Sequence, residues 1–120
     1  MKVVLAGAKD CAEVISEVKK HLNDIGVEVV LCESENYIFE AARKLAKDEA
    51  KKIVLFSQTG LDVWAKAGKT PGLCAAACHN PLKAEEIRKE KEINTLCVGI
   101  KINKLKYIIS IIDVWLITDL

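Results

Sequence analysis

Apolar residues occur along this chain in two repeating patterns, which predict alternating strands and helices. Short, almost continuously apolar runs predict buried strands at residues 3–5, 27–31, 52–56, 73–77 and 95–98. Apolar residues at three-to-four spacing predict amphipathic helices at about 10–25, 38–46, 61–67, 82–92 and 105–116. Asn80 and Pro81 suit the N-cap and first residue of the fourth helix, and Gly26 suits the end of the first.

This alternation predicts the fold class, which is α/β with a parallel sheet and helices on both faces. The predicted strands are apolar throughout, as expected of strands that are buried on both sides. Because crossover connections are right-handed, few topologies remain. We expect a three-layer, doubly wound, Rossmann-like sheet of five parallel strands in the order 2-1-3-4-5. We also expect residues 1–120 to form a single domain, because no linker or repeat interrupts the pattern.

The amino-acid composition limits which partners the protein could bind and in which cellular compartment it is expected. The chain has 120 residues, is 51% hydrophobic and 29% charged, and carries a net charge of +1, so no overall field attracts nucleic acid or a membrane surface. Aromatic residues are too few to form base-stacking platforms. No apolar run reaches the roughly 20 residues that a membrane span needs. The odd number of cysteines, without secretory features, predicts reduced thiols and a cytoplasmic protein.

Polar residues follow several predicted strands at the edge where such sheets bind ligands, beyond the carboxyl ends of the strands. The richest group is Ser57, Gln58, Thr59 and Gly60, which lies between a buried strand and a predicted helix. Its hydroxyl, amide and backbone N–H groups suit a phosphate or an anionic oxygen. An ordinary turn between a strand and a helix would explain the same residues.

Three further residues at this edge are candidates for binding. Lys9 could attract an anion, although a solvated lysine at the start of a helix is the plainer interpretation. His79 could contact a ligand or be an ordinary loop residue, and Asn80 adjoins it. His21, the other histidine, borders the apolar stripe of the first helix far from this edge, so we expect it to pack or to face solvent.

Cofactor motifs are missing from the sequence. Gly7 stands alone after the first strand, where a dinucleotide site needs Gly-x-Gly-x-x-Gly. Cys74, Cys78 and His79 lack the spacing of a zinc site and have no second ligand pair, so we expect structural thiols and no metal. A receiver domain shares the fold class but needs an acidic residue where Ser57 stands. We therefore expect no cofactor.

Several short segments, each present once, follow one another along the chain with a particular order and spacing. They are Ser57-Gln58-Thr59-Gly60, Gly72-Leu73, Asn80-Pro81, Asn94 to Gly99 and Asp113-Val114-Trp115-Leu116. In order and spacing they resemble the family of ribose-5-phosphate isomerase B and galactose-6-phosphate isomerase, over essentially the whole chain. The resemblance implies a short, divergent member that interconverts the aldose and ketose forms of a pentose or hexose phosphate, without a cofactor.

The resemblance also implies site residues. The family's catalytic cysteine, the base that moves a proton between adjacent carbons, falls at Ser57. A thiol, with a pKa of roughly 8.5, is partly ionised near neutral pH, whereas a serine hydroxyl needs an activating base. The family's ring-opening histidine falls at Glu90, so Glu90 or His79 would have to act as the base. We expect catalytic roles for Ser57, Thr59 and Glu90, and substrate binding by Lys9, Gln58, Thr59, Gly60, His79 and Asn80.

Two functions from different classes follow from the resemblance. In this family the active site is shared across a dimer, which implies a homodimer or a heterodimer with a homologous subunit. The last predicted helix is apolar over more than one face, as expected if it packs on both the sheet and a partner. The alternative is a catalytically inactive descendant that binds a sugar phosphate or another protein, or that serves only in dimerisation.

Overall fold

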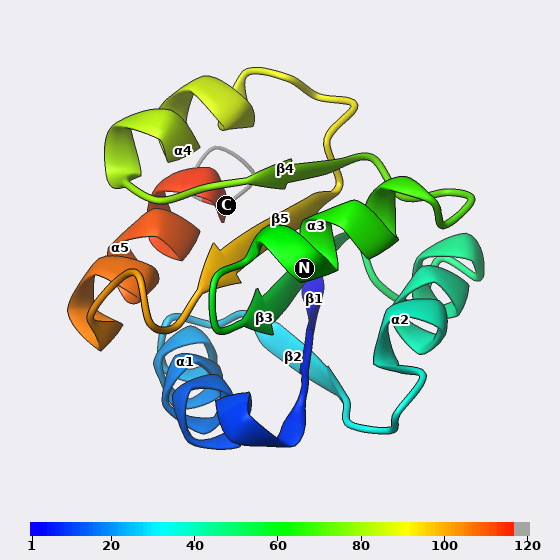
Figure 1. Cartoon of the computed structure of the whole chain (residues 1–120), viewed down its shortest axis with the longest axis horizontal. Helices are drawn as coiled ribbons and strands as arrows, with labels where there is room; N and C mark the ends of the chain where they lie inside the picture. The colour runs from blue at the N-terminus through cyan, green and yellow to red at the C-terminus, as the bar shows by residue number, and fades with distance from the viewer. Residues whose placement is uncertain (117–120) are drawn as a thin grey trace.

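Five parallel strands form a sheet between two layers of helices (Figure 1). A computed structural model describes residues 1–116 of the chain. The strands are β1 (Lys2–Gly7), β2 (Glu28–Cys32), β3 (Lys52–Ser57), β4 (Ala75–Ala77) and β5 (Thr95–Gly99). The helices are α1 (Ala12–Asp24), α2 (Tyr37–Ala46), α3 (Leu61–Gly68), α4 (Pro81–Arg88) and α5 (Leu105–Leu116), and a 3₁₀ turn, η1 (Lys9–Cys11), precedes α1.

The strand order is β2-β1-β3-β5-β4, so the predicted order 2-1-3-4-5 is wrong for the last two strands. All five residues of β5 are buried, whereas the three alanines of β4 are half-buried. A fully apolar strand suits the interior of the sheet, and a three-residue strand of small side chains suits its edge. Chain order alone does not distinguish the two arrangements, whereas the difference in burial does.

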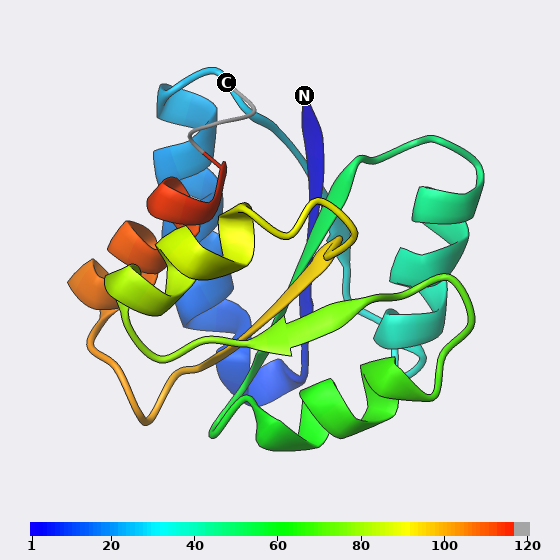
Figure 2. The same cartoon turned by 90° about the horizontal axis from the view of Figure 1, so that it is seen from above.

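The observed order decides which helices share a face. Because each crossover is right-handed, the return from β4 to β5 places α4 on the face opposite α3. Seen from above, α1, α4 and α5 cover one face of the sheet, and α2 and α3 cover the other (Figure 2). Each layer has its own apolar core, the first including Leu5, Phe56 and Trp115 and the second including Ala6, Leu55 and Val63.

Helix ends follow the predicted capping residues. The Asn80 side chain accepts a hydrogen bond of 2.8 Å from the backbone N–H of Lys83, and Pro81 is the first residue of α4. Gly26, just beyond the end of α1, has a φ of +89°, a conformation that glycine adopts without strain. The predicted start of the first helix at Asp10 is displaced to Ala12, since η1 (Lys9–Cys11) precedes α1.

Helix α5 buries one apolar face within the chain and leaves Tyr107 exposed. It packs against both α1 and α4, and its fully buried residues include Ile108, Ile111 and Trp115. Two helical neighbours therefore account for the buried residues of α5, and packing on a partner chain stays a prediction. Between residues 1 and 116, no helix combines the length and the hydropathy that crossing a lipid bilayer requires.

Candidate functional site

The turn after β3 is built around the hydroxyl groups of Ser57 and Thr59. Ser57 is 5% exposed, and its Oγ atom accepts a hydrogen bond of 2.8 Å from the backbone N–H of Gly60. Thr59 Oγ1 accepts a bond of 3.3 Å from the N–H of Leu61, the first residue of α3. Both hydroxyl oxygens therefore hold the turn at the N-terminus of the helix.

Gly60 is fixed in this turn by its conformation and its surroundings. Its φ is +81°, which side chains other than glycine adopt only with strain. A Cβ atom at this position would also lie 3.1 Å from the carbonyl carbon of Val98 and 3.2 Å from the nitrogen of Gly99. The turn thus packs directly on the end of β5, and the residue at position 60 must be glycine.

A cleft of about 260 Å³ opens beside this turn. Three segments form it, namely the residues after β1, the start of α2 and the turn into α3. Its lining residues are Ala8, Asp10, Tyr37, Ser57, Gln58, Thr59 and Asp62. Connections from β1 and β3 leave the sheet in opposite directions, so the cleft lies at the point where ligands bind in doubly wound sheets.

The two carboxylates of the cleft have different surroundings. Asp10 Oδ2 accepts a hydrogen bond of 2.8 Å from Gln58 Nε2, and Cys11 Sγ lies 3.6 Å from Asp10 Oδ1. Asp62, in the first turn of α3, has no hydrogen-bond or ion-pair partner among residues 1–116. Of the two, Asp62 therefore has oxygens available to a bound molecule.

Tyr37 contributes a protonated hydroxyl to the cleft. Burial, and then the nearby Asp62 carboxylate, raise the pKa of Tyr37 above its ordinary value. No lysine or arginine is among the residues that line the cleft. The cleft therefore offers hydroxyl donors and carboxylate acceptors to a polar ligand, and it carries net negative charge.

No buried thiol of the chain can supply a thiolate at neutral pH. Burial, and then the Asp10 charge, raise the pKa of Cys11 to about 12, and burial with the Asp62 charge raises that of Cys97 to about 12. Burial also raises the pKa of Cys32 and Cys78. These four cysteines are consequently neutral, packed side chains, as predicted for structural thiols.

Cys74 differs from the prediction of buried thiols. It is exposed, and it precedes the edge strand β4. Within the described range 1–116, histidine, cysteine and carboxylate side chains nowhere gather in a group of three that could hold a metal ion.

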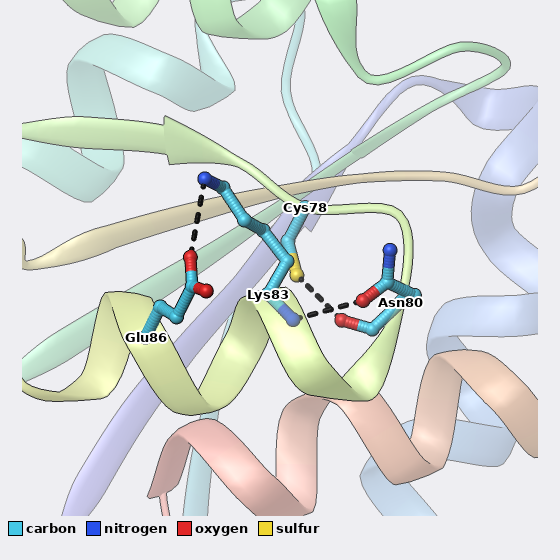
Figure 3. Close-up of polar contacts among 4 residues, drawn as sticks. All are labelled: Cys78, Asn80, Lys83 and Glu86. Carbon is cyan, nitrogen blue, oxygen red and sulfur yellow. Dashed lines mark hydrogen bonds and ion pairs between the residues drawn. The ribbon is translucent and has the colours of Figure 1, made fainter.

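Asn80 and His79 follow β4, away from the cleft. The Asn80 side chain caps α4, and the backbone carbonyl oxygen of Asn80 accepts a hydrogen bond of 3.2 Å from Cys78 Sγ (Figure 3). On the same helix Lys83 Nζ lies 3.4 Å from Glu86 Oε2 (Figure 3). His79 is exposed and is not among the residues that line the cleft. Binding of substrate by these two residues stays a prediction.

Lys9 and Glu90 do not line the cleft at Ser57. Lys9 belongs to η1 and lines a different, larger cleft of about 420 Å³. Glu90 lies in the connection from α4 to β5, before the amino end of β5, whereas Ser57 ends β3 at the carboxyl edge. A single chain therefore does not bring Glu90 to Ser57, and a catalytic role for Glu90 would require a second chain.

Asp10, Tyr37 and Asp62 were not among the predicted site residues. The sequence carried a signal for two of them, since Asp10 follows the first strand and Asp62 follows the Ser57 turn in the first turn of a helix. Tyr37 comes from α2, whose position against the turn depends on the tertiary fold. Four predicted residues, Ser57, Gln58, Thr59 and Gly60, do form the turn beside the cleft.

A polar cleft at the switch point of a doubly wound sheet lies where α/β proteins of this class bind small ligands, at the carboxyl edge of the strands. Comparison with known proteins narrows this class. The family model for ribose/galactose isomerases matches residues 3–120. The chain belongs to this family of sugar-phosphate isomerases, and the predicted resemblance is confirmed.

Relatives of known function and structure agree with this assignment. The chain is 31% identical over 108 residues to a 4-deoxy-4-sulfo-D-erythrose isomerase of Clostridium sp. strain MSTE9, covering 82% of this chain and 68% of the relative. It is 28% identical over 81 residues to D-erythrulose-4-phosphate isomerase 2 of Mycolicibacterium smegmatis, covering 68% and 53%. The structure of Clostridium thermocellum ribose-5-phosphate isomerase B shares the fold, with a TM-score of 0.89, 24% identity and coverage of 97% and 84%.

Proposed function

We propose that this chain is a single-domain subunit of an aldose–ketose isomerase that acts on a small phosphorylated sugar. The observation that carries the proposal is the cleft beside Ser57, which combines hydroxyl groups, an unpartnered carboxylate and a helix N-terminus at the switch point of the sheet. Two relatives named for sulfonated erythrose and for erythrulose 4-phosphate support a short sugar with an anionic group as substrate.

The reaction requires one proton carrier and stabilisation of one negative charge. A base removes the proton from C2 of the aldose, and the electron pair forms an enediolate with the charge on O1. The proton of the O2 hydroxyl moves to O1, the base returns its proton to C1, and C2 becomes the carbonyl carbon. The sugar as a whole neither gains nor loses electrons, so the reaction needs no redox cofactor.

Asp62 is the residue best suited to carry the proton. A carboxylate is ionised at neutral pH and can accept a proton within hydrogen-bond reach. Asp10 is already held by Gln58, whereas Asp62 has no partner among the described residues. Ser57 is less suitable, since its Oγ is buried and bonded to Gly60, and no base adjoins it. This assignment replaces Glu90 and His79 as the proposed base.

The start of α3 is suited to hold the negative charge of the enediolate. The first turn of a helix leaves backbone N–H groups without helical acceptors, and its dipole favours an anion. Thr59 Oγ1 accepts a hydrogen bond from the N–H of Leu61, and the Thr59 hydroxyl can still donate its own proton to another acceptor. Thr59 and the N–H groups beyond Leu61 therefore supply the donors for the developing oxyanion.

We further propose that the enzyme acts in the cytoplasm and as a dimer. The five cysteines are all free thiols, which suits a reducing compartment. A second copy, or a homologous subunit, would supply the groups that one chain lacks at the cleft, among them cationic groups and a counterpart of Glu90. Sedimentation of the purified chain, alone and mixed with a cysteine-bearing homologue, distinguishes the two kinds of dimer.

An isomerisation assay tests the function. The chain is incubated with erythrose 4-phosphate, ribose 5-phosphate, allose 6-phosphate and galactose 6-phosphate, with and without a homologue that carries the catalytic cysteine. We expect conversion of at least one sugar by the chain alone. Conversion only in the presence of the homologue would assign this chain a supporting role in a mixed dimer.

One observation favours the alternative of an inactive binding protein. By the resemblance, the family's catalytic cysteine falls at Ser57, whose hydroxyl oxygen holds the turn. Thermal-shift measurements with the same sugars separate the two functions, because binding stabilises the folded state whether or not turnover follows. Stabilisation by a sugar phosphate without conversion would support the binding protein and contradict the isomerase.

A further inference from the structure

One hydrogen bond lies at the outer rim of the cleft at Ser57. Gln58 Nε2 donates it to Asp10 Oδ2 over 2.8 Å, and both residues line the cleft. Gln58 and Asp10 are exposed, whereas Ser57 is buried. This bond, which we call the Gln58–Asp10 bridge, therefore joins the segment after β1 to the turn after β3 on the solvent side of the cleft.

The backbone at both ends of the bridge is held by hydrogen bonds. The carbonyl oxygen of Gln58 accepts a bond of 2.9 Å from the N–H of Lys101, which ties the turn to the segment after β5. At the other end, the N–H of Cys11 donates a bond of 2.9 Å to the carbonyl oxygen of Ala8, and Cys11 is fully buried. Asp10 lies between these two residues in the chain. Because both attachments are fixed, the bridge forms with little loss of backbone freedom and is a rigid part of the rim.

The cleft that carries this bridge is small. Its volume of about 260 Å³ is below the range of about 300–1,000 Å³ that is typical of pockets for drug-sized ligands. On the inner side the turn has no free space, since Ser57 is buried and a Cβ atom on Gly60 would lie only 3.1 Å from the backbone of Val98. A larger molecule is therefore accommodated only at the rim, where the bridge lies.

We propose that the Gln58–Asp10 bridge limits the length of the substrate, so that the chain selects four-carbon sugar phosphates over five- and six-carbon ones. This inference rests on the proposed isomerase function. With the reacting carbons between Thr59 and Asp62, a four-carbon sugar leaves the bridge intact, whereas each further carbon presses against it. A longer sugar binds only if the bond breaks, and the Asp10 carboxylate is then unpaired beside an anionic ligand. Gln58 is thus a specificity-determining residue.

Reduced sugar phosphates test this selection without any turnover, because an alditol has no carbonyl group to isomerise. The Kd values of erythritol 4-phosphate and ribitol 5-phosphate are measured with the full chain by calorimetry. We expect the wild type to bind erythritol 4-phosphate at least about 10 times more tightly, which is the discrimination that a pocket makes against one extra carbon. In Gln58→Ala the ratio should fall to about two, through tighter binding of ribitol 5-phosphate. Equal Kd values in the wild type, no binding of either alditol, or an unchanged ratio in Gln58→Ala would overturn the proposal.

Further variants separate the bond from the bulk of the glutamine. Gln58→Asn keeps the amide but is one methylene shorter, so it should lose the bond and lower the ratio. Asp10→Ala removes the acceptor and should lower it equally, while the double variant Asp10→Ala/Gln58→Ala should show no further change. Asn23→Ala, an exposed amide at the far end of α1, is the matched control. Additive effects of the Asp10 and Gln58 variants would contradict a shared bond.

Kinetics then connect the bridge to the reaction. We expect kcat/KM of the wild type to be at least about 10 times higher for erythrose 4-phosphate than for ribose 5-phosphate, and this preference to be largely lost in Gln58→Ala. Turnover with the same preference in both proteins would overturn the role of the bridge and leave the isomerase function. Selective binding of erythritol 4-phosphate without turnover of either sugar would refute the isomerase function and support the bridge as the selector of a binding protein.

Discussion

Ser57 Oγ accepts a hydrogen bond of 2.8 Å from the backbone N–H of Gly60, three residues further on. The bond closes the turn between β3 and α3, and it is buried. Ser57 therefore has a structural role in this turn. It fixes the N-terminus of α3, and with it the placement of Thr59 and Asp62 at the cleft.

Replacing Ser57 by alanine should loosen this turn. The variant leaves the buried N–H of Gly60 without an acceptor, which costs about 1–3 kcal/mol in the free energy of unfolding. We expect this loss in urea denaturation, together with lower turnover because Asp62 is less well positioned. Ser16→Ala, a change at an exposed serine in α1, is the control for stability and should be nearly neutral. Equal stability of the two variants would show that the bond does not hold the turn.

Asn80 is expected to behave as a helix cap and not as a ligand. Asn80→Ala removes the acceptor for the N–H of Lys83 and should lower the free energy of unfolding by about 1 kcal/mol. Asn80→Ser, which keeps a capping oxygen, should restore most of it. KM for the sugar substrate should stay unchanged in both. A large rise in KM with unchanged stability would instead support the predicted role of Asn80 in substrate binding.

The buried thiols predict a loss of stability in alkali. In the unfolded chain a thiol loses its proton near its ordinary pKa, roughly 8.5–9, whereas Cys11 and Cys97 keep theirs until about pH 12 in the folded state. The unfolded state then binds fewer protons, so the contribution of these two thiols to stability is constant below pH 8 and falls as pH rises from about 9 to 12, by up to about 1.4 kcal/mol per pH unit and thiol.

Cysteine variants separate this effect from the titration of lysines. Cys97→Ala should flatten the alkaline fall in the free energy of unfolding, while Cys74→Ala, at an exposed thiol, should leave the slope unchanged. The same slope in both variants would mean that burial of the Cys97 thiol does not govern the alkaline limb.

The His21 side chain connects α1 to α5. Its Nε2 atom lies 2.9 Å from each carboxylate oxygen of Asp113, and both side chains are about one-third exposed. Because water screens such a pair, we expect Asp113→Asn to cost about 0.5–1 kcal/mol in urea denaturation at pH 6. A double-mutant cycle with His21→Gln isolates the pair, and a coupling energy near zero would contradict a stabilising interaction.

The sequence was sufficient to predict the strands and the residues of the Ser57 turn. Strands such as β3 are continuous apolar runs, and the turn is a local feature, because one short segment supplies all of its hydrogen bonds. The order of β4 and β5 was harder, since the right-handed crossover rule permits both orders. Relative burial decides it, and the contrast between Ala75–Ala77 and Thr95–Gly99 could have indicated which strand is at the edge.

The composition of the cleft could not be predicted in the same way. Asp10, Tyr37 and Asp62 come from three segments that meet only when α2 and α3 pack on the sheet. The sequence likewise gives no sign that the fold places Glu90 at the opposite edge of the sheet from Ser57, so Glu90 was a candidate. Local patterns therefore located the turn, and tertiary packing determined which ionisable groups face it.

The most direct test of the proposed isomerase is proton exchange at the sugar, followed by NMR in deuterated water. The wild type, Asp62→Asn and the control Asp24→Asn, an exposed aspartate at the far end of α1, are incubated with the sugar phosphate that gives turnover. We predict deuterium at C1 of the ketose with the wild type and the control, and a rate at least about 100 times lower with Asp62→Asn. No conversion of any sugar phosphate by the wild type, or equal rates for the two aspartate variants, would contradict the account.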